Sequence, residues 1–447
     1  MARVSSYIIG APVGDGKALL VHGYSGALDL VELSSYEFLE VNKGRIISDE
    51  ALGKNIAQHL YNRGYLTDLT EEEERAYVTR IYKALNKKNR LTNASFTIVV
   101  TYDCNLCCPY CFEKEYAWKL KRHTLDKTTV DKIYSTIDSI RSNVRNASKN
   151  ITLFGGEPLL RKNLEIVEYI VFEGRKRGMK FSAITNGVEL DSFLHLIDKD
   201  LIGHLQITLD GVGDVHDQTR CHREGIPTFD TIINNIRLAL EKDISISIRF
   251  NADKNNFKDF NVLEKYFKEC GFYSFNKFRA SMSRTVNYDS KSNSNKFFSQ
   301  KEFLSFINND SPGGRIQDFS AYKLLSTAIK NRKPLSYKGS FCSSQINGYV
   351  FDPIYNIYPC WEVIGDEKNC IGNFADGVFI PNAEGIRTWH DGNYYRDECS
   401  RCPSLLLCGG GCFAKNLHSF QCTRMTDIVR YNAVKVYNEI ISNHNSN

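Results

Sequence analysis

Short apolar runs alternate with amphipathic stretches between residues 95 and 283. Each run is rich in β-branched residues and ends in a polar or glycine-rich turn, as strands of a parallel sheet do. Six such runs are found, at residues 95–103, 150–158, 180–187, 204–211, 245–252 and, less regularly, 276–283. Segments with helical periodicity lie between them, at residues 129–142, 164–178, 193–201, 231–243 and 260–271. The pattern therefore predicts six β/α units.

Alternating strands and helices predict a parallel sheet joined by right-handed crossovers. Eight units would close a full barrel, so six predict an α/β fold with an open, partial (β/α)6 barrel. The motifs CNLCCPYC, GGEP, TNG and LDG each follow directly on a predicted strand. Barrel enzymes place their chemistry at these strand ends, so we expect the site there.

The flanking segments have other patterns. Residues 1–90 predict a small α+β domain, with strands at 6–12 and 17–33 and helices at 34–44, 49–64 and 69–88. Residues 284–340 are rich in Ser, Asn and Lys and predict a flexible bridge after the barrel domain, residues 91–283. Residues 341–447 predict an irregular, cysteine-rich domain in which metal replaces a hydrophobic core, with a closing helix from Thr426 to about Ser442.

Composition and charge say little about the functional class of the protein. The 447 residues are 42% hydrophobic and 24% charged, and the net charge is only +5 with both signs interspersed. Such a balance gives no reason to expect a nucleic-acid or membrane partner. The N-terminus fits neither a signal peptide nor an anchor, and no stretch approaches the roughly 20 apolar residues of a spanning helix. We expect a cytoplasmic protein.

The distribution of the cysteines is more informative than composition or charge. Of the 14, four lie between residues 104 and 111, seven between 342 and 412, and another is Cys422. Clustering without a secretion signal indicates metal binding rather than disulfides. Cys104, Cys108 and Cys111 have C-x3-C-x2-C spacing, which can hold three irons of a cubane and leave the fourth open. A zinc knuckle is the alternative, although zinc normally takes four ligands and no histidine is near.

The motif C-x3-C-x-Φ-C after the first predicted strand, with Tyr110 as the aromatic residue, resembles the radical S-adenosylmethionine (SAM) superfamily over residues 95–283. The resemblance implies a [4Fe-4S] cluster on Cys104, Cys108 and Cys111, with Tyr110 against the adenine of SAM. It also implies that the GGEP residues contact the methionine amino group. Those residues are Gly155, Gly156, Glu157 and Pro158. Cys107 has no place in the motif.

Weaker matches to the same superfamily are residues that would contact the ribose or carboxylate of SAM. They are Thr185, Asn186, Gln206 and Arg249. Each could equally be a capping or turn residue. The resemblance implies that the cluster, reduced by a donor such as flavodoxin or ferredoxin, cleaves SAM to a deoxyadenosyl radical. The cofactor carries this chemistry, and the protein positions it and excludes water.

The C-terminal cysteines resemble the SPASM extension of peptide-modifying radical enzymes, through C-x2-C-x5-C-x3-C at residues 399–412. A pair of zinc sites is the alternative. The resemblance implies two auxiliary [4Fe-4S] clusters. One would lie on Cys342, Cys360 and Cys412, and the other on Cys399, Cys402, Cys408 and Cys422. Cys370 is a candidate fourth ligand of the first, although its setting is typical of a packed turn. The glycine that usually lies five residues before the second cysteine is Tyr355 here.

The resemblance also bears on function. Sulfatase-maturing relatives carry an aspartate after the second SPASM cysteine, where this chain has Trp361 and then Glu362. Residues 1–90 loosely resemble elements that bind the leaders of ribosomally made peptides, and a plain cap on the barrel is the alternative. We therefore expect a radical peptide maturase that installs a thioether or carbon–carbon crosslink, with Asp210 and Glu362 as candidate catalytic residues. The alternatives are a maturase or dehydrogenase for another protein or a small molecule, an iron–sulfur electron carrier, and a zinc-scaffolded binding module.

Overall fold

A computed structural model gives the fold. It describes residues 2–114, 120, 123–286, 294–310, 316, 320–391, 396–417 and 421–445. The chain divides into two compact units, each built from separate segments. The barrel unit comprises residues 90–317 and 343–392, and the terminal unit comprises residues 1–89, 318–342 and 393–447. The division into four consecutive domains stays a prediction.

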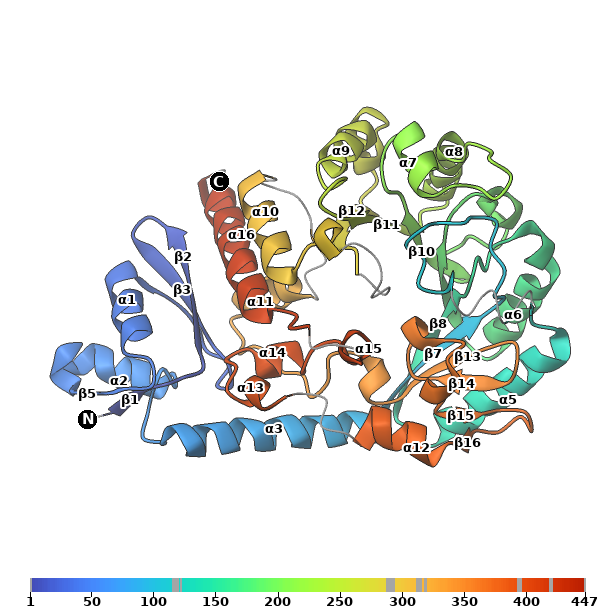
Figure 1. Cartoon of the computed structure of the whole chain (residues 1–447). Coiled ribbons are helices and arrows are strands. Elements are labelled where there is room, and N and C mark those ends of the chain that lie inside the picture. Colours follow the sequence, from blue (N-terminus) through green and yellow to red (C-terminus); the bar gives the residue numbers. More distant parts are fainter. Residues whose placement is uncertain are drawn as a thin grey trace. The chain divides into compact units, whose positions relative to one another are not determined.

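The barrel unit contains the predicted parallel sheet (Figure 1). Its six strands are β7 (Asn93–Val99), β8 (Asn146–Phe154), β9 (Lys180–Thr185), β10 (Ile202–Thr208), β11 (Ser245–Ala252) and β12 (Phe278–Arg284). They follow one another in the order of the chain and all pair in parallel. The prediction of an α/β fold with a six-stranded partial barrel is confirmed.

Side chains alternate between the two faces of this sheet. In β11, Ile246, Ile248 and Phe250 are buried, and the residues between them are half-buried and polar. Covering helices lie along the outer face (Figure 1). They are α5 (Lys127–Ser142), α6 (Leu164–Lys176), α7 (Asp214–Thr219), α8 (Phe229–Leu240) and α9 (Asp259–Glu269). The polar face, which includes Ser247 and Arg249, is left on the inner side of the sheet.

Two expectations for the barrel unit were wrong. Residues 193–201 form no α-helix, and only a 3-10 turn over Leu190–Phe193 is present before Asp198 accepts a hydrogen bond from the Asp200 amide (2.8 Å). This local bond competes with helical pairing. The segment after residue 341 is also less irregular than predicted, since β13 (Gly348–Phe351) extends the parallel sheet beside β7.

After β13 the sheet continues with antiparallel strands. These are β14 (Asn356–Tyr358), β15 (Gly372–Asn373) and β16 (Ile380–Pro381). The turn between β13 and β14 contains Tyr355 in the left-handed region, at φ +68°. A glycine adopts this conformation without strain, which explains why the SPASM pattern has one at this position. Here the Tyr355 ring is held by Lys132, whose Nζ lies 4.9 Å from the ring centre.

The terminal unit contains two small sheets. One has the order β2-β3-β4, formed by β2 (Ile8–Gly14), β3 (Lys17–His22) and β4 (Leu28–Glu32). The other pairs β1 (Ala2–Val4) with β5 (Ile46–Ile47) and β6 (Leu66–Thr67). The single strand predicted at residues 17–33 is instead a hairpin, because Gly26, at φ +77°, turns the chain between β3 and β4.

Helices complete the terminal unit. They are α1 (Leu33–Val41), α2 (Lys54–Asn62), α3 (Glu71–Thr92), α11 (Ala321–Asn331), α13 (Asp397–Ser400), α14 (Leu405–Cys408), α15 (Phe413–Asn416) and α16 (Met425–Asn445). The predicted flexible bridge 284–340 contains two helices, α10 (Gln300–Asp310) and α11, while residues 287–293, 311–315 and 317–319 of it lie outside the described residues. None of the helices within the described ranges combines the length and apolar character needed to cross a bilayer.

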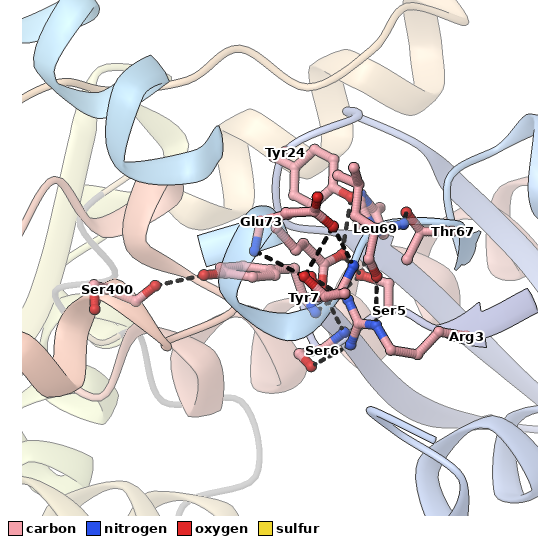
Figure 2. Close-up of polar contacts among 12 residues, drawn as sticks. Arg3, Ser5, Ser6, Tyr7, Tyr24, Thr67, Leu69, Glu73 and Ser400 are labelled. Carbon is pink, nitrogen blue, oxygen red and sulfur yellow. Dashed lines mark hydrogen bonds and ion pairs between the residues drawn. The ribbon is translucent and has the colours of Figure 1, made fainter. Parts of the chain in front are cut away.

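A buried polar network joins the parts of the terminal unit (Figure 2). Glu74 of α3 is fully buried and pairs with Arg3 of β1 at 2.5 Å. Ser5 and Tyr24 also donate hydrogen bonds to its carboxylate, at 2.5 and 2.8 Å. The Tyr7 hydroxyl donates to the carbonyl oxygen of Ser400, so the network reaches the cysteine-rich segment.

We expect Glu74→Ala to lower the free energy of unfolding by about 3–5 kcal/mol, because Arg3 would remain buried without its partner. Glu73 is the matched control, since it is exposed and only caps α3 through Thr70, so Glu73→Ala should cost about 1 kcal/mol. Urea unfolding of both variants measures the difference. Equal losses would contradict the assignment of Glu74 as the central anion.

Candidate functional site

The loop after β7 carries Cys104, Cys108 and Cys111 and is fixed at its base. The Val100 amide donates to Phe154 of β8 (2.9 Å), and the Glu157 amide donates to the Asp103 carbonyl (2.7 Å). The buried Tyr102 hydroxyl donates to Asp352 at 2.9 Å. These bonds place the cysteine loop at the carboxyl ends of β7 and β8, where the sequence predicted the site.

The three loop thiols interact electrostatically. Burial raises the pKa of Cys104, and the negative charges of Glu157, Cys108 and Cys111 raise it further. Burial likewise raises the pKa of Cys111 to about 12. Thiolates are the ligands of iron, so bound iron must supply the positive charge that keeps these sulfurs deprotonated. The Leu106 amide donates to Cys104 Sγ (3.4 Å), a contact that also suits a cluster ligand.

A single-ion site does not fit this loop. Nowhere in the described parts of the chain do three His, Cys, Asp or Glu side chains converge tightly enough to hold one metal ion. A tetrahedral zinc site needs four such ligands around one point. In a [4Fe-4S] cubane each thiolate coordinates a different iron, so the cysteine sulfurs are farther apart than the ligands of a single ion. The donor set therefore fits an iron–sulfur cluster better than zinc.

The GGEP loop packs directly on the cysteine loop. A Cβ at Gly155 would lie 2.5 Å from the Thr101 carbonyl oxygen, and one at Gly156 would lie 2.1 Å from that of Asp103. Only glycine permits this approach, and Gly155 also has φ +103°. The two glycines are thus required by the contact between the loops, whatever they bind. Pro158 follows, with its carbonyl oxygen 3.4 Å from Asn163 Nδ2.

Glu157, Thr185 and Asn186 are brought together. Oε1 of Glu157 accepts from the Thr185 hydroxyl (2.6 Å) and the Leu159 amide (2.9 Å), and Oε2 accepts from the Asn186 amide (2.5 Å). Burial raises the pKa of Glu157 to about 7, against the lowering effect of these bonds. Both of its oxygens thus serve to join the ends of β8 and β9. Asn186 Nδ2 also approaches Cys104 Sγ at 3.9 Å.

Glu113 is a site residue that the sequence reasoning missed. It is only 7% exposed, and its Oε2 is buried without a hydrogen-bond partner in the described structure. Burial raises its pKa to about 7, while a bond from the Gly156 amide lowers it. Its own amide bonds to Cys111, so Glu113 connects the cysteine and GGEP loops. A buried acid in this position suits a cationic group of a ligand.

A second buried group surrounds Tyr110. Its hydroxyl donates to Asp210 Oδ2 and accepts from Arg220 Nη1 at 2.7 Å. Asp210 is fully buried, and its other oxygen accepts from the Asn251 amide (2.9 Å). Burial raises the pKa of Asp210, whereas Arg220 lowers it. With both oxygens occupied, Asp210 holds Tyr110 in position here, and its catalytic role stays a prediction.

Arg220 was also missed, because it reaches the cysteine loop from the segment after α7 and no sequence spacing reveals that approach. Its Nε is buried without a partner in the described structure. Arg249 donates to the Asn251 side chain (2.9 Å). Gln206 of β10 is the strand partner of Ser247 in β11. Both therefore lie on the polar inner face, and neither contacts the cysteine loop through a hydrogen bond that the structure records.

The terminal unit holds a second cysteine site. Four cysteines, Cys399, Cys402, Cys408 and Cys422, line one pocket between α13, α14 and the start of α16. Burial raises the pKa of Cys408 to about 12 and that of Cys399 to about 11, and neighbouring thiolates raise both. Three successive glycines, Gly409 to Gly411, have positive φ and turn the chain at Cys408. The Gly410 amide bonds to the Cys408 sulfur.

The other predicted ligands are not gathered in this pocket. Cys342 lies on another segment of the terminal unit, and Cys360 lies in the barrel unit. Cys412 directly follows the pocket residue Gly411 but is not one of the residues that line the pocket. Their role as ligands of a cluster stays a prediction. The Cys370 thiol is buried and donates to the Gly372 carbonyl (3.0 Å), which is the packed turn that the sequence indicated.

Glu362 lies in a 3-10 turn of the barrel unit with Trp361. The Trp361 ring stacks on Phe154, the residue before GGEP, with 5.7 Å between ring centres. Glu362 Oε2 is buried without a hydrogen-bond partner in the described structure. Its catalytic role stays a prediction.

Comparisons with known proteins agree with this geometry. A model of the Radical SAM superfamily matches residues 98–261. A cysteine-type anaerobic sulfatase-maturating enzyme from Clostridium novyi is 24% identical over 327 residues, which cover 69% of this chain and 85% of the relative.

Two solved structures share the fold. Native anSMEcpe with bound AdoMet is 20% identical, with a TM-score of 0.57 over 79% of this chain and 99% of the other. SuiB of Streptococcus suis bound to precursor peptide SuiA is 16% identical, with a TM-score of 0.51 over 95% and 99% of the two chains. Residues 98–261 of the chain therefore match the Radical SAM superfamily, and the chain shares its fold with these two solved structures.

Proposed function

We propose that the chain is a radical SAM maturase that abstracts a hydrogen from a ribosomally made precursor peptide and installs a thioether or carbon–carbon crosslink. The observation that carries the proposal is the make-up of the terminal unit. In this unit an N-terminal sheet, whose last strand β4 pairs on one side only among the described strands, shares one compact body with a four-cysteine pocket. A peptide-binding edge and an auxiliary cluster are the two parts that such a reaction needs besides the radical source.

Each part has a chemical task in this proposal. The cluster on Cys104, Cys108 and Cys111, once reduced by an external donor, would cleave SAM to the deoxyadenosyl radical. Glu113 would face the ammonium group of SAM, because its buried Oε2 has no hydrogen-bond donor among the described residues, whereas both oxygens of Glu157 are occupied. Asp210 would hold Tyr110 against the adenine. The four-cysteine pocket would hold an auxiliary cluster that accepts the electron left by crosslinking.

The edge strand β4 supports peptide capture. β4 pairs with β3 and lies at the end of its sheet among the described strands. The His22 amide donates to the Ala27 carbonyl, and the Leu33 amide donates to the Gly16 carbonyl. Because amides along an antiparallel strand point alternately toward and away from the partner strand, these two bonds place the Leu30 amide on the side away from β3. Leu30 is 46% exposed, and Val41 of α1 and Ile56 of α2 in the same unit are also exposed. An extended leader could add here as a further strand.

We expect Leu30→Pro to weaken binding of the precursor peptide about tenfold, because it removes an outward amide and blocks the edge. Leu30→Ala keeps the amide and is the matched control. Fluorescence anisotropy with a labelled candidate leader peptide measures the affinity, and SAM cleavage without peptide should stay unchanged. Equal affinity of the proline and alanine variants would contradict β4 as the docking edge.

A point change tests this edge better than removal of residues 1–90. Arg75 of α3 donates to the Ser400 hydroxyl (2.7 Å), and Tyr82 of the same helix donates to the Gly409 carbonyl (3.2 Å). Deletion would therefore expose the cysteine pocket as well as remove the sheet. A loss of activity in the deletion variant would not separate the two causes.

The second candidate is oxidation of a side chain on a protein substrate, and the Clostridium novyi relative favours it. Anaerobically reconstituted enzyme, SAM, a reductant and the precursor peptide distinguish the two reactions. A product that is two hydrogens lighter than the precursor, and whose proteolytic fragments remain covalently joined, supports crosslinking. A product that reacts with hydrazine contains an aldehyde and supports the maturase of the sulfatase type. No deoxyadenosine at all would overturn both.

A further inference from the structure

The cysteine loop of the barrel unit pairs with a second segment, residues 221–223. Leu106 and His222 form an antiparallel bridge, so Cys107 and Cys221 are directly opposite each other. The Cys107 amide donates to the Cys221 carbonyl and the Arg223 amide donates to the Asn105 carbonyl, each at 2.9 Å. The two segments thus form a short ladder beside the cluster ligands.

The thiols of this pair are in contact. Cys107 Sγ and Cys221 Sγ are 2.9 Å apart, and each sulfur also lies within 3.5 Å of the other residue's carbonyl oxygen. Directly opposite residues of an antiparallel pair have Cα atoms roughly 4.5–5.5 Å apart, which lies within the range that disulfides span. Cys107 is exposed and Cys221 is partly exposed, so a soluble oxidant can reach them.

We propose that Cys107 and Cys221 are a modification site, a dithiol that a low-molecular-weight disulfide such as oxidised glutathione converts reversibly to a disulfide. The thiolate of Cys107 attacks the glutathione disulfide and releases one reduced glutathione. Cys221 then attacks the mixed disulfide, forms the Cys107–Cys221 bond and releases the second. Two thiols are oxidised and one disulfide is reduced, and the two thiol protons pass to the two released glutathiones.

The bond has a structural consequence. Cys107 precedes the cluster ligand Cys108, and Cys221 follows Arg220, which donates to Tyr110. The disulfide would therefore tether the cysteine loop to the segment that holds Tyr110. It uses none of the three cluster ligands, so the iron content should be the same in both states. This inference concerns the barrel unit alone and does not depend on the substrate proposed above.

The test uses cluster-loaded enzyme treated with oxidised glutathione without oxygen, then alkylated, digested and analysed by mass spectrometry. We expect a peptide pair joined through Cys107 and Cys221, and its loss after addition of a reducing dithiol. In Cys221→Ser the reaction should stop at glutathione bound to Cys107, because the second thiol is missing. Cys270→Ser, which removes a cysteine of the barrel unit outside this pair, should form the joined peptides as the wild type does.

Two results would overturn the proposal. One is a stable glutathione adduct on Cys107 of the wild type with no joined peptide. The other is a loss of iron in Cys107→Ser, which would make Cys107 a cluster ligand instead of half of a dithiol pair. Unchanged iron in Cys107→Ser together with loss of the joined peptides supports it.

Discussion

Cys108→Ala is expected to reduce SAM cleavage to the background of cluster-free protein. The loop offers three thiolates to a cubane, so we expect a cluster left with only two protein ligands to be lost during purification. Iron should fall by about four atoms per chain in this variant, the content of one cubane. Anaerobic iron and sulfide assays, together with chromatographic detection of deoxyadenosine, measure both effects.

Cys107→Ala is the matched control, since the residue is next to Cys108 in the same loop. Its sulfur contacts Cys221 at 2.9 Å and lies outside the C-x3-C-x2-C spacing. We expect iron content and SAM cleavage within about twofold of the wild type. Loss of SAM cleavage in the control but not in Cys108→Ala would show that the loop ligates its cluster in another register.

The sequence predicted which motifs lie close together where local spacing or strand order decides it. Strand ends meet at one edge of a parallel sheet, so the motifs after β7, β8 and β9 had to lie together. The four cysteines of the terminal pocket are likewise close in the chain, within residues 399–422. Glu157, Thr185 and Asn186 come from separate motifs, yet the order of the strands alone brings them into contact.

The residues that the sequence did not predict lie in loops. Arg220 and Cys221 approach the cysteine loop from the segment after α7, whose path depends on packing that no periodicity encodes. Glu113 looks like an ordinary surface acid in the sequence, and only its burial reveals a role. The hairpin β3-β4 was read as one strand because Gly26 lies between two apolar runs. Tertiary context, rather than propensity, decided each case.

Cys408→Ala is expected to abolish modification of the precursor peptide while SAM cleavage continues. Cys408 lines the terminal pocket, and its sulfur accepts a bond from the Gly410 amide. An auxiliary cluster held by this pocket would supply the acceptor for the electron released when the crosslink forms. Without this auxiliary cluster, deoxyadenosine should still accumulate, but the peptide product should fall below detection. About four irons per chain should be lost.

Cys370→Ala is the control for this experiment. Its buried thiol donates to the Gly372 carbonyl, so the substitution removes a packed thiol and no proposed ligand of the pocket. Peptide product and iron content should stay near those of the wild type, with a stability loss of about 1 kcal/mol. If Cys408→Ala kept its iron and still yielded product, the pocket would hold no cluster. If it lost SAM cleavage as well, the terminal pocket would support the radical step itself, and its proposed role as an electron acceptor for crosslinking would be wrong.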